Sequence, residues 1–97
     1  MIEQGDIWSA DLRDEVRRLV LIVSVGRFHQ LADRAIVAPQ LFVEPDDVPF
    51  PWRVELDGAG FAGDLLRSIP TSRLLERTGR ATPTVMQQVQ RVTRNIL

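Results

Sequence analysis

The stretch LVLIVS at residues 19–24 decides the fold. It contains the longest apolar run of the chain, and its β-branched and aliphatic composition is typical of a strand that is covered on both faces. The apolar run is far too short to span a bilayer, which takes about 20 residues. The stretch therefore predicts a central strand of a water-exposed domain.

Residues 7–12 and 52–56 alternate apolar and polar residues, as half-buried strands do. Residues 26–30 (GRFHQ) break the pattern and predict a loop, while EPDD and DGAG at residues 44–47 and 57–60 predict turns. Besides the central strand, we expect strands at residues 7–12, 34–43, 52–56 and about 64–69. The body of the domain is therefore expected to be antiparallel β.

The last segment changes to a helical period. Apolar residues recur on one helical face, Thr82 can cap the helix and Pro83 suits its first position. The residues on that face are Val85, Met86, Val89, Val92 and Ile96. We expect a mainly β fold, a five-stranded antiparallel barrel with a helical turn near residues 72–75 and a C-terminal α-helix.

Length and composition limit what else the chain can be. Its 97 residues suit one domain, 1–97, and a hydrophobic fraction of 44% with 26% charged residues is ordinary for a globular protein. The absence of cysteine excludes disulfides, thiolate catalysis and zinc sites that need a thiolate. Its N-terminus has no basic region before an apolar stretch, so we expect a cytoplasmic protein with no membrane contact.

Charge is divided unevenly along the chain. Residues 65–97 carry six Arg and one acid, whereas residues 1–64 carry six Arg and twelve acids, for a net charge of -1. A nucleic-acid surface must therefore be a local patch on an acidic molecule. All twelve basic residues are Arg, which suits bidentate phosphate contacts, although a GC-rich genome gives the same bias.

The remaining titratable residues allow few kinds of chemistry. His29 is the only histidine, so one chain can build neither a two-histidine ribonuclease site nor a histidine metal cage, and a lone loop histidine is more often a surface residue. Asp46 and Asp47 can bind Mg²⁺, but beside Pro45 they are also typical of a solvated turn. We expect no metal and no cofactor.

A polar cluster between the first two strands is the best candidate site. Arginine can stabilise the charge on a five-coordinate phosphate while a carboxylate takes the 2′-hydroxyl proton, so RNA cleavage needs neither metal nor histidine. A charged turn between strands is the alternative interpretation of the same residues. The cluster consists of Arg13, Asp14, Glu15, Arg17 and Arg18.

Several motifs occur in the order found in one family. Gly5-Asp6-Ile7-Trp8 opens the first strand, Arg18 enters a strand that ends in Ser24, and LRSIPTSRL at residues 66–74 precedes Gly79 and the amphipathic helix. With AIVA at residues 35–38, this series resembles the MazF/PemK toxin family across nearly the whole chain.

The resemblance implies a toxin of a type II toxin–antitoxin system with an SH3-like barrel of the CcdB/MazF type. Such a toxin is a homodimeric endoribonuclease, an mRNA interferase and hydrolase, that cleaves single-stranded RNA at short sequences without metal. A cognate antitoxin, an acidic segment that folds across the RNA groove, holds it inactive. By position Arg18 is the catalytic arginine, and Glu15 stands for an acidic residue in a shortened loop.

The chain departs from the family at two positions. Leu19 replaces the proline after the catalytic arginine, and Leu41 replaces a catalytic Thr or Ser, with Gln40 beside it. Leucine cannot donate a hydrogen bond to phosphate. Three interpretations follow: Gln40 substitutes, activity is low, or the chain binds RNA without cutting it.

The RNA surface expected from the resemblance and from residue chemistry is a groove shared by two copies. Arg13, Arg17 and Arg67 would contact phosphates, and Phe28 or His29 would stack on a base, with core packing as the alternative for Phe28. Ser24 and Gln40 complete the predicted RNA-binding set.

Two other functions remain compatible with the sequence. CcdB toxins share the barrel and poison DNA gyrase, and Ala38-Pro39-Gln40-Leu41 is similar to one of their strands, although this chain lacks their Trp-Gly-Ile end. The second alternative is a barrel without catalytic activity that only binds RNA or an antitoxin. The sequence sets neither the RNA cleavage motif nor the identity of the antitoxin.

Overall fold

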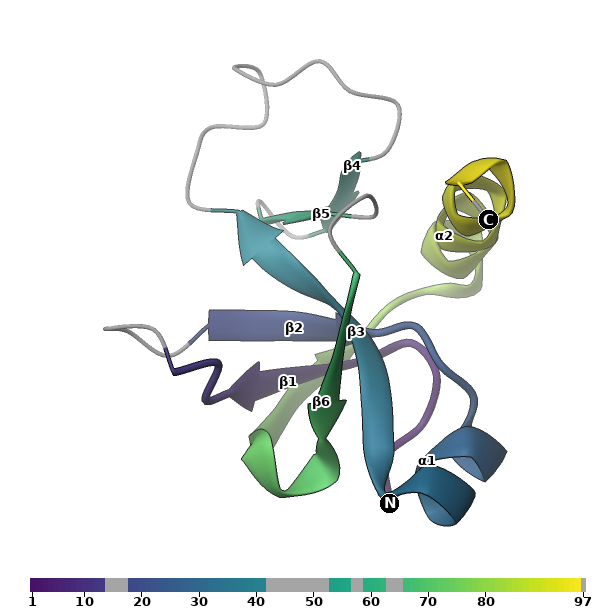
Figure 1. Cartoon of the computed structure of the whole chain (residues 1–97). Helices are drawn as coiled ribbons and strands as arrows, with labels where there is room; N and C mark the ends of the chain where they lie inside the picture. Colours follow the sequence, from purple (N-terminus) through teal and green to yellow (C-terminus); the bar gives the residue numbers. More distant parts are fainter. Residues whose placement is uncertain (14–17, 42–52, 57–58, 63–65, 97) are drawn as a thin grey trace.

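The computed structural model describes residues 1–13, 18–41, 53–56, 59–62 and 66–96 (Figure 1). These residues form seven strands, two α-helices and one short 3₁₀ turn, η2. In chain order they are β1 (Asp6–Ala10), β2 (Arg18–Ile22), α1 (Gly26–Ala32), β3 (Arg34–Leu41), β4 (Arg53–Leu56), β5 (Ala59–Ala62), β6 (Arg67–Pro70), η2 (Thr71–Arg73), β7 (Leu74–Arg80) and α2 (Pro83–Ile96).

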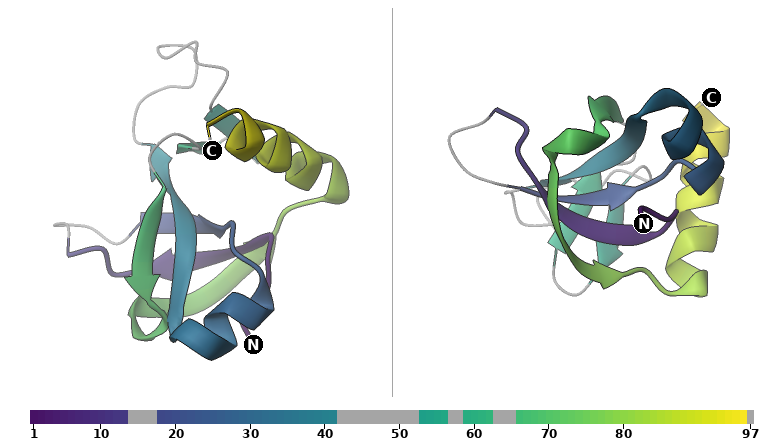
Figure 2. Two further views of the ribbon diagram at one scale, coloured as in Figure 1. Left: turned by 45° about the vertical axis from the view of Figure 1, so that its right-hand side comes forward. Right: turned by 90° about the horizontal axis from the view of Figure 1, so that it is seen from below.

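Five of the strands make the body of the fold, in the order β6-β3-β2-β1-β7, and every recorded pair is antiparallel. Since η2 joins β6 directly to β7, the two ends of this order are consecutive in the chain, and the sheet curls into a small barrel (Figures 1 and 2). The predicted class, a five-stranded antiparallel barrel with a C-terminal helix, is confirmed.

The composition of the barrel differs from the prediction in its second half. The expected fourth strand, β4, pairs with β5 in a hairpin that joins β3 at Gln40 and Leu41. The unpredicted strand β7 completes the barrel along β1 instead. Its sequence, LLERTGR, is largely exposed and has little alternation. This segment therefore forms a strand because it pairs with the otherwise open edge of β1, and not because of its own residue pattern.

Two apolar clusters cover the two faces of the central strand β2. Val20 and Ile22 face the barrel interior, while Leu21 between them faces α2, and all three are fully buried. The barrel cluster also contains Ala10, Leu12, Ala35, Val37, Ile69 and Leu74, and the helix cluster contains Ile7, Ala38, Phe61, Ala81 and Val89. The prediction from LVLIVS, a strand covered on both faces, is confirmed.

The C-terminal helix begins where predicted. Thr82 Oγ1 accepts the Val85 N–H at 3.3 Å, Pro83 is the first helical residue, and Val85, Met86 and Val89 pack on the helix cluster. The side chains of Val92 and Ile96, predicted for the same face, lie outside the described ones. No helix in the described part of the chain is long and apolar enough to cross a membrane.

Gly5 is required where the chain enters β1. Its φ is +91°, and an added Cβ would meet Met86 Sδ of α2 at 3.2 Å. Its N–H donates to Ile22 O at 2.8 Å, and its carbonyl accepts the Ala81 N–H at 2.7 Å. Gly5 therefore joins β1, the end of β2 and the approach to α2 at one close contact.

The prediction of a loop at residues 26–30 is wrong, because these residues form most of α1. The helix is only seven residues long and has no side-chain N-cap, so sequence periodicity could not reveal it. It ends at Asp33, whose φ of 52° is left-handed, and Asp33 O accepts the Thr71 N–H at 3.1 Å. Contacts with distant segments stabilise this helix.

Candidate nucleic-acid interface

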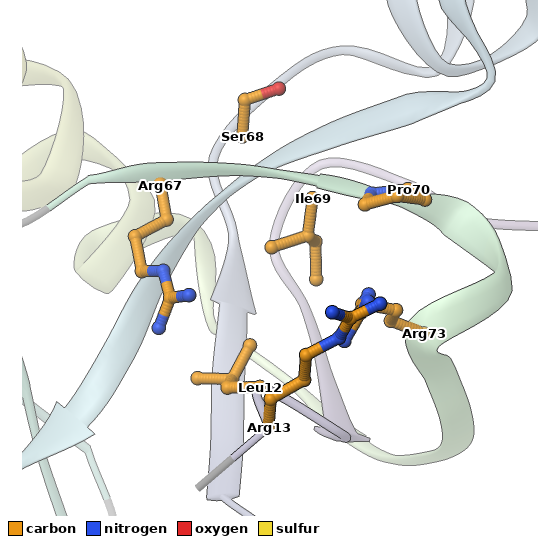
Figure 3. Close-up of a pocket in the computed structure, with 7 residues that line it drawn as sticks. All are labelled: Leu12, Arg13, Arg67, Ser68, Ile69, Pro70 and Arg73. Carbon is orange, nitrogen blue, oxygen red and sulfur yellow. The ribbon is translucent and has the colours of Figure 1, made fainter.

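Three arginines line one pocket at the end of the barrel, which we call the arginine pocket (Figure 3). It has a volume of about 260 Å³ and is bounded by the end of β1, strand β6 and η2. Its lining residues are Leu12, Arg13, Arg67, Ser68, Ile69, Pro70 and Arg73. Leu12 and Ile69 belong to the barrel core, so cationic side chains surround an apolar floor.

Asp11 positions two of these arginines. Its N–H donates to Arg73 O at 3.0 Å, which ties the end of β1 to η2, and its Oδ1 accepts the Arg13 N–H at 2.9 Å. The second bond holds Arg13 at a φ of 63°, a left-handed conformation that costs a non-glycine residue about 1 kcal/mol. Backbone strain of this kind is concentrated at functional sites.

A separate contact holds the β6 side of the pocket. Arg34 of β3 donates from Nε to Ser68 Oγ and from Nη2 to Ser68 O, both at 2.8 Å. Figure 3 shows Ser68 on the far side of β6, away from Arg67 and Ile69. Arg34 therefore fixes β6 from behind, and the side chain of Ser68 does not point into the pocket.

The cations of the pocket are not neutralised by the acids that the structure describes. Within the described residues, arginine ion pairs are formed by Arg77 and Arg80 with Glu3 and Asp6, at the other end of β1 and β7. None of these pairs involves Arg13, Arg67 or Arg73. Among the described residues, the arginine pocket is therefore a local concentration of positive charge, an arrangement suited to an anionic ligand.

Arg18 begins β2, opposite Ala10 of β1. Because alternate residues of a strand share a face, Arg18 lies on the same face as Val20 and Ile22, at the end of the barrel interior. The Nε atom of Arg18 is buried. Arg18 is not among the described residues that line the arginine pocket, and Ala10, its partner in β1, comes shortly before the lining residues Leu12 and Arg13.

Gln40 lies on the other face of the sheet. The recorded β2–β3 register ends where Val20 pairs with Pro39, and Gln40 and Leu41 pair with Phe61 and Gly60 of β5. Gln40 Oε1 accepts the Leu19 N–H at 3.3 Å, so this side chain supports the start of β2. Gln40 alternates with Ala38 of the helix cluster, so it lies on the face opposite Val20 and Arg18.

Ser24 and His29 form a structural network instead of a surface. His29 is only 6% exposed, its Nδ1 lies 3.1 Å from Ile2 O, and its Nε2 lies 2.6 Å from Ser24 Oγ. Since a carbonyl only accepts, Nδ1 carries the proton and Nε2 accepts the Ser24 hydroxyl, which itself accepts the Ile36 N–H at 2.9 Å. The expectation of a surface histidine is wrong, because both ring nitrogens have partners inside the fold.

Phe28 is half-buried on α1 and meets the His29 ring edge to face, with centroids 6.3 Å apart. This contact favours packing over base stacking, the two interpretations left open by the sequence. Glu15 and Arg17, with Asp14, Asp46 and Asp47, lie outside the described residues.

Sequence reasoning missed Asp11 and Arg73. Arg73 was part of the LRSIPTSRL segment, but no spacing rule connects it to Arg13, sixty positions away. The hydrogen bond from Asp11 to Arg73 O is the contact that brings them together, and it depends on the pairing of β1 with β7.

Comparison with known proteins identifies the family. Residues 3–97 match the family described as PemK-like, MazF-like toxin of type II toxin-antitoxin system. The chain belongs to this family. The resemblance inferred from its motifs is thereby confirmed, and the family match spans nearly the whole chain.

Several solved structures share this fold at low sequence identity. An endoribonuclease from a mycobacterial species, in complex with its cognate antitoxin, is 15% identical, with 98% of this chain and 93% of that chain covered and a TM-score of 0.86. A MazE-MazF structure from Deinococcus radiodurans is 18% identical, with coverages of 98% and 93% and a TM-score of 0.82.

The Mycobacterium tuberculosis toxin MazF-mt6 is 19% identical, with 93% of each chain covered and a TM-score of 0.74. None of the curated proteins compared with the chain matches it significantly. At these identities the likeness establishes the fold, and the roles of individual side chains rest on the geometry described above.

Proposed function

We propose that this PemK/MazF-family chain is an endoribonuclease that cleaves single-stranded RNA without a metal ion, with Arg18 at the scissile phosphate. The observation that carries the proposal is the position of Arg18 on the interior face of β2, paired with Ala10 at the end of β1, from which the chain continues into the cationic pocket. Structural neighbours named endoribonucleases support the same activity.

The chemistry requires a base, a leaving group and a stabiliser of charge. The 2′-hydroxyl attacks the adjacent phosphorus, its proton passes to a base, and the bond from phosphorus to the 5′ oxygen breaks. A cyclic phosphate and a 5′-hydroxyl strand, which gains a proton, result. Arg18 stabilises the five-coordinate phosphate, and Glu15 takes the proton.

The RNA surface extends from Arg18 toward the arginine pocket. Arg13, Arg17 and Arg67 contact phosphates, whereas Ser24 and His29 serve the fold and are not part of the surface we propose. Gln40 acts through the backbone of Leu19 and positions β2. Of the three interpretations of Leu41, we favour low activity, because Gln40 lies on the face opposite Arg18.

We further propose that the toxin acts in the cytoplasm as a homodimer and is inhibited by a cognate antitoxin. Neighbours solved as MazE-MazF or antitoxin complexes support the antitoxin partner. An acidic segment that crosses the cationic surface would bind and inhibit in one event.

The decisive experiment is cleavage of a long single-stranded RNA in EDTA, with cut ends mapped by primer extension. Wild type is compared with Arg18→Ala and with Arg27→Ala, which removes the same charge from the exposed surface of α1. We expect discrete cuts by wild type and Arg27→Ala and none by Arg18→Ala, with equal circular dichroism for all three proteins.

Cuts that persist in Arg18→Ala would refute the assignment of the catalytic residue. If wild type binds the RNA but leaves it whole, the proposed activity is wrong and the chain is a binding module. Loss of gyrase supercoiling in a parallel assay, without RNA cleavage, would favour a CcdB-like poison.

A second measurement tests position 41. Leu41→Thr restores the hydroxyl that the family resemblance implies at this position, and a hydrogen-bond donor at a developing negative charge is worth about a hundredfold in rate when well placed. We expect cleavage at least about tenfold faster than wild type, and Leu41→Val, with the same branching and no hydroxyl, should show no gain.

A further inference from the structure

The arginine pocket combines two chemistries that a nucleotide presents together. Arg13, Arg67 and Arg73 supply planar donors that match phosphate oxygens, and Leu12, Ile69 and Pro70 supply an apolar floor. Figure 3 shows the three guanidinium groups on the same side of β6 as Ile69, with Ser68 on the other side. A phosphate beside a flat or apolar group satisfies both parts of the pocket.

The size of the pocket restricts the ligand to one unit. Pockets for drug-sized ligands have volumes of about 300–1,000 Å³. The arginine pocket, at about 260 Å³, is smaller than this range and suits a single phosphate with part of its nucleoside. Longer strands would have to continue outside it.

The described lining of the pocket differs from the proposed cleavage site. None of the seven described lining residues carries a carboxylate or an imidazole that could take the 2′-hydroxyl proton, and Arg18 is not among them. A strand cut at Arg18 would then place a different phosphate in the pocket.

Hydrogen bonds within the fold also fix the backbone around the pocket. Asp11 fixes the backbones of Arg13 and Arg73, and Arg34 fixes β6 beside Arg67 through Ser68. Because the backbones that carry these arginines are already fixed, binding has to order only their side chains.

We infer that the arginine pocket is a second phosphate site for single-stranded RNA, in which Arg13, Arg67 and Arg73 hold a phosphate other than the scissile one. The inference rests on the proposed function for the identity of the ligand. Arg73, which no motif identified, is a binding residue of this site.

The test uses a fluorescein-labelled 2′-O-methyl RNA strand, which has no free 2′-hydroxyl and cannot be cut. Anisotropy titrations over a series of salt concentrations give the affinity and its salt slope for wild type, Arg73→Ala and the control Arg27→Ala. A set of strands in which each phosphate in turn is a neutral methylphosphonate identifies the phosphate that the pocket holds.

We expect Arg73→Ala to bind about five- to tenfold more weakly, with a salt slope about 0.7 smaller in magnitude, the value for one phosphate contact on a single strand. One methylphosphonate should weaken binding to wild type by at least a similar factor and have a smaller effect in Arg73→Ala, where only Arg13 and Arg67 remain to contact that phosphate. Arg27→Ala should match wild type.

Equal affinities and equal methylphosphonate profiles for wild type and Arg73→Ala would overturn the inference. A polyglutamate of matched charge that binds as tightly as the RNA, and loses the same factor in Arg73→Ala, would also overturn it by indicating a site for carboxylates. Because the strand cannot be cut, failure of RNA cleavage would count against the proposed function and leave this result standing.

Discussion

The arginine pocket and the Ser24–His29 network are both built from residues of chemically active types, but they differ in what their polar atoms do. In the network, both ring nitrogens of His29 and the hydroxyl of Ser24 have partners inside the fold. In the pocket, the hydrogen bonds hold the backbones, and the three guanidinium groups surround an open volume. A group whose bonds are completed internally stabilises the fold, whereas one positioned only through its backbone remains available to a ligand.

The strongest test of this comparison is removal of the His29 ring. His29→Ala leaves the hydroxyl of Ser24 and the carbonyl of Ile2 without their partner and opens a cavity beneath α1. We expect a loss of about 3 kcal/mol in the free energy of unfolding, measured by urea denaturation. The exposed neighbour Gln30→Ala should stay within about 0.5 kcal/mol of wild type, and an equally small effect of His29→Ala would disprove the structural role.

The corresponding change in the pocket should have the opposite profile. Arg67→Ala removes an exposed cation of β6, so we expect RNA affinity to fall by about tenfold, or about 1.4 kcal/mol, through loss of one charge-assisted contact. Stability should change by less than about 0.5 kcal/mol. Anisotropy and urea denaturation of the same samples measure both, and a large stability loss with unchanged affinity would place Arg67 with the network.

A smaller effect is expected at Asp11, which connects to the pocket without lining it. Asp11→Ala removes the acceptor of the Arg13 N–H and should destabilise the protein by about 1 kcal/mol and weaken RNA binding. Asp11→Asn keeps an oxygen acceptor and removes a negative charge, so binding should be retained or improved. Parallel loss of affinity in both variants would show that the charge of Asp11, not its hydrogen bond, matters.

The smallest expected effect is at Arg13, where two substitutions separate the backbone strain of this residue from its contribution to RNA binding. Arg13→Gly relieves a left-handed conformation but adds entropy to the unfolded chain, so we expect a net gain of about 0.5 kcal/mol in stability. RNA affinity should fall because the guanidinium is gone. Arg13→Ala should lose the affinity without the gain, and thermal denaturation that ranks alanine above glycine would contradict the strain argument.

Much of the fold could be predicted because local patterns agree with the tertiary structure. Strand β2 is apolar on both faces, and α2 has both a cap and an apolar stripe, so each was predictable from its own residues. Helix α1 was missed because its stability comes from the bonds of His29 to distant segments. Strand β7 was missed because β1 supplies its partner.

The candidate site was less predictable for the same reason. The sequence predicted Arg13, Arg17, Arg18 and Arg67 as phosphate ligands by residue type and family resemblance, and Arg13 and Arg67 line the pocket. It also predicted Ser24 and His29 as RNA-binding residues, although their bonds lie within the fold. The type of a residue indicates which chemistry its side chain can perform. Its burial and its hydrogen bonds within the fold determine whether a ligand can reach that side chain.

The sequence by itself determined the family, the strand covered on both faces, the capped C-terminal helix and the concentration of arginine in the last third of the chain. Each of these depends on neighbouring residues or on composition. Only the tertiary structure decided that Arg73 joins Arg13 and Arg67, and that His29 is buried. These outcomes depend on contacts between segments far apart in the sequence, such as Asp11 with Arg73 and His29 with Ile2, which no local pattern encodes.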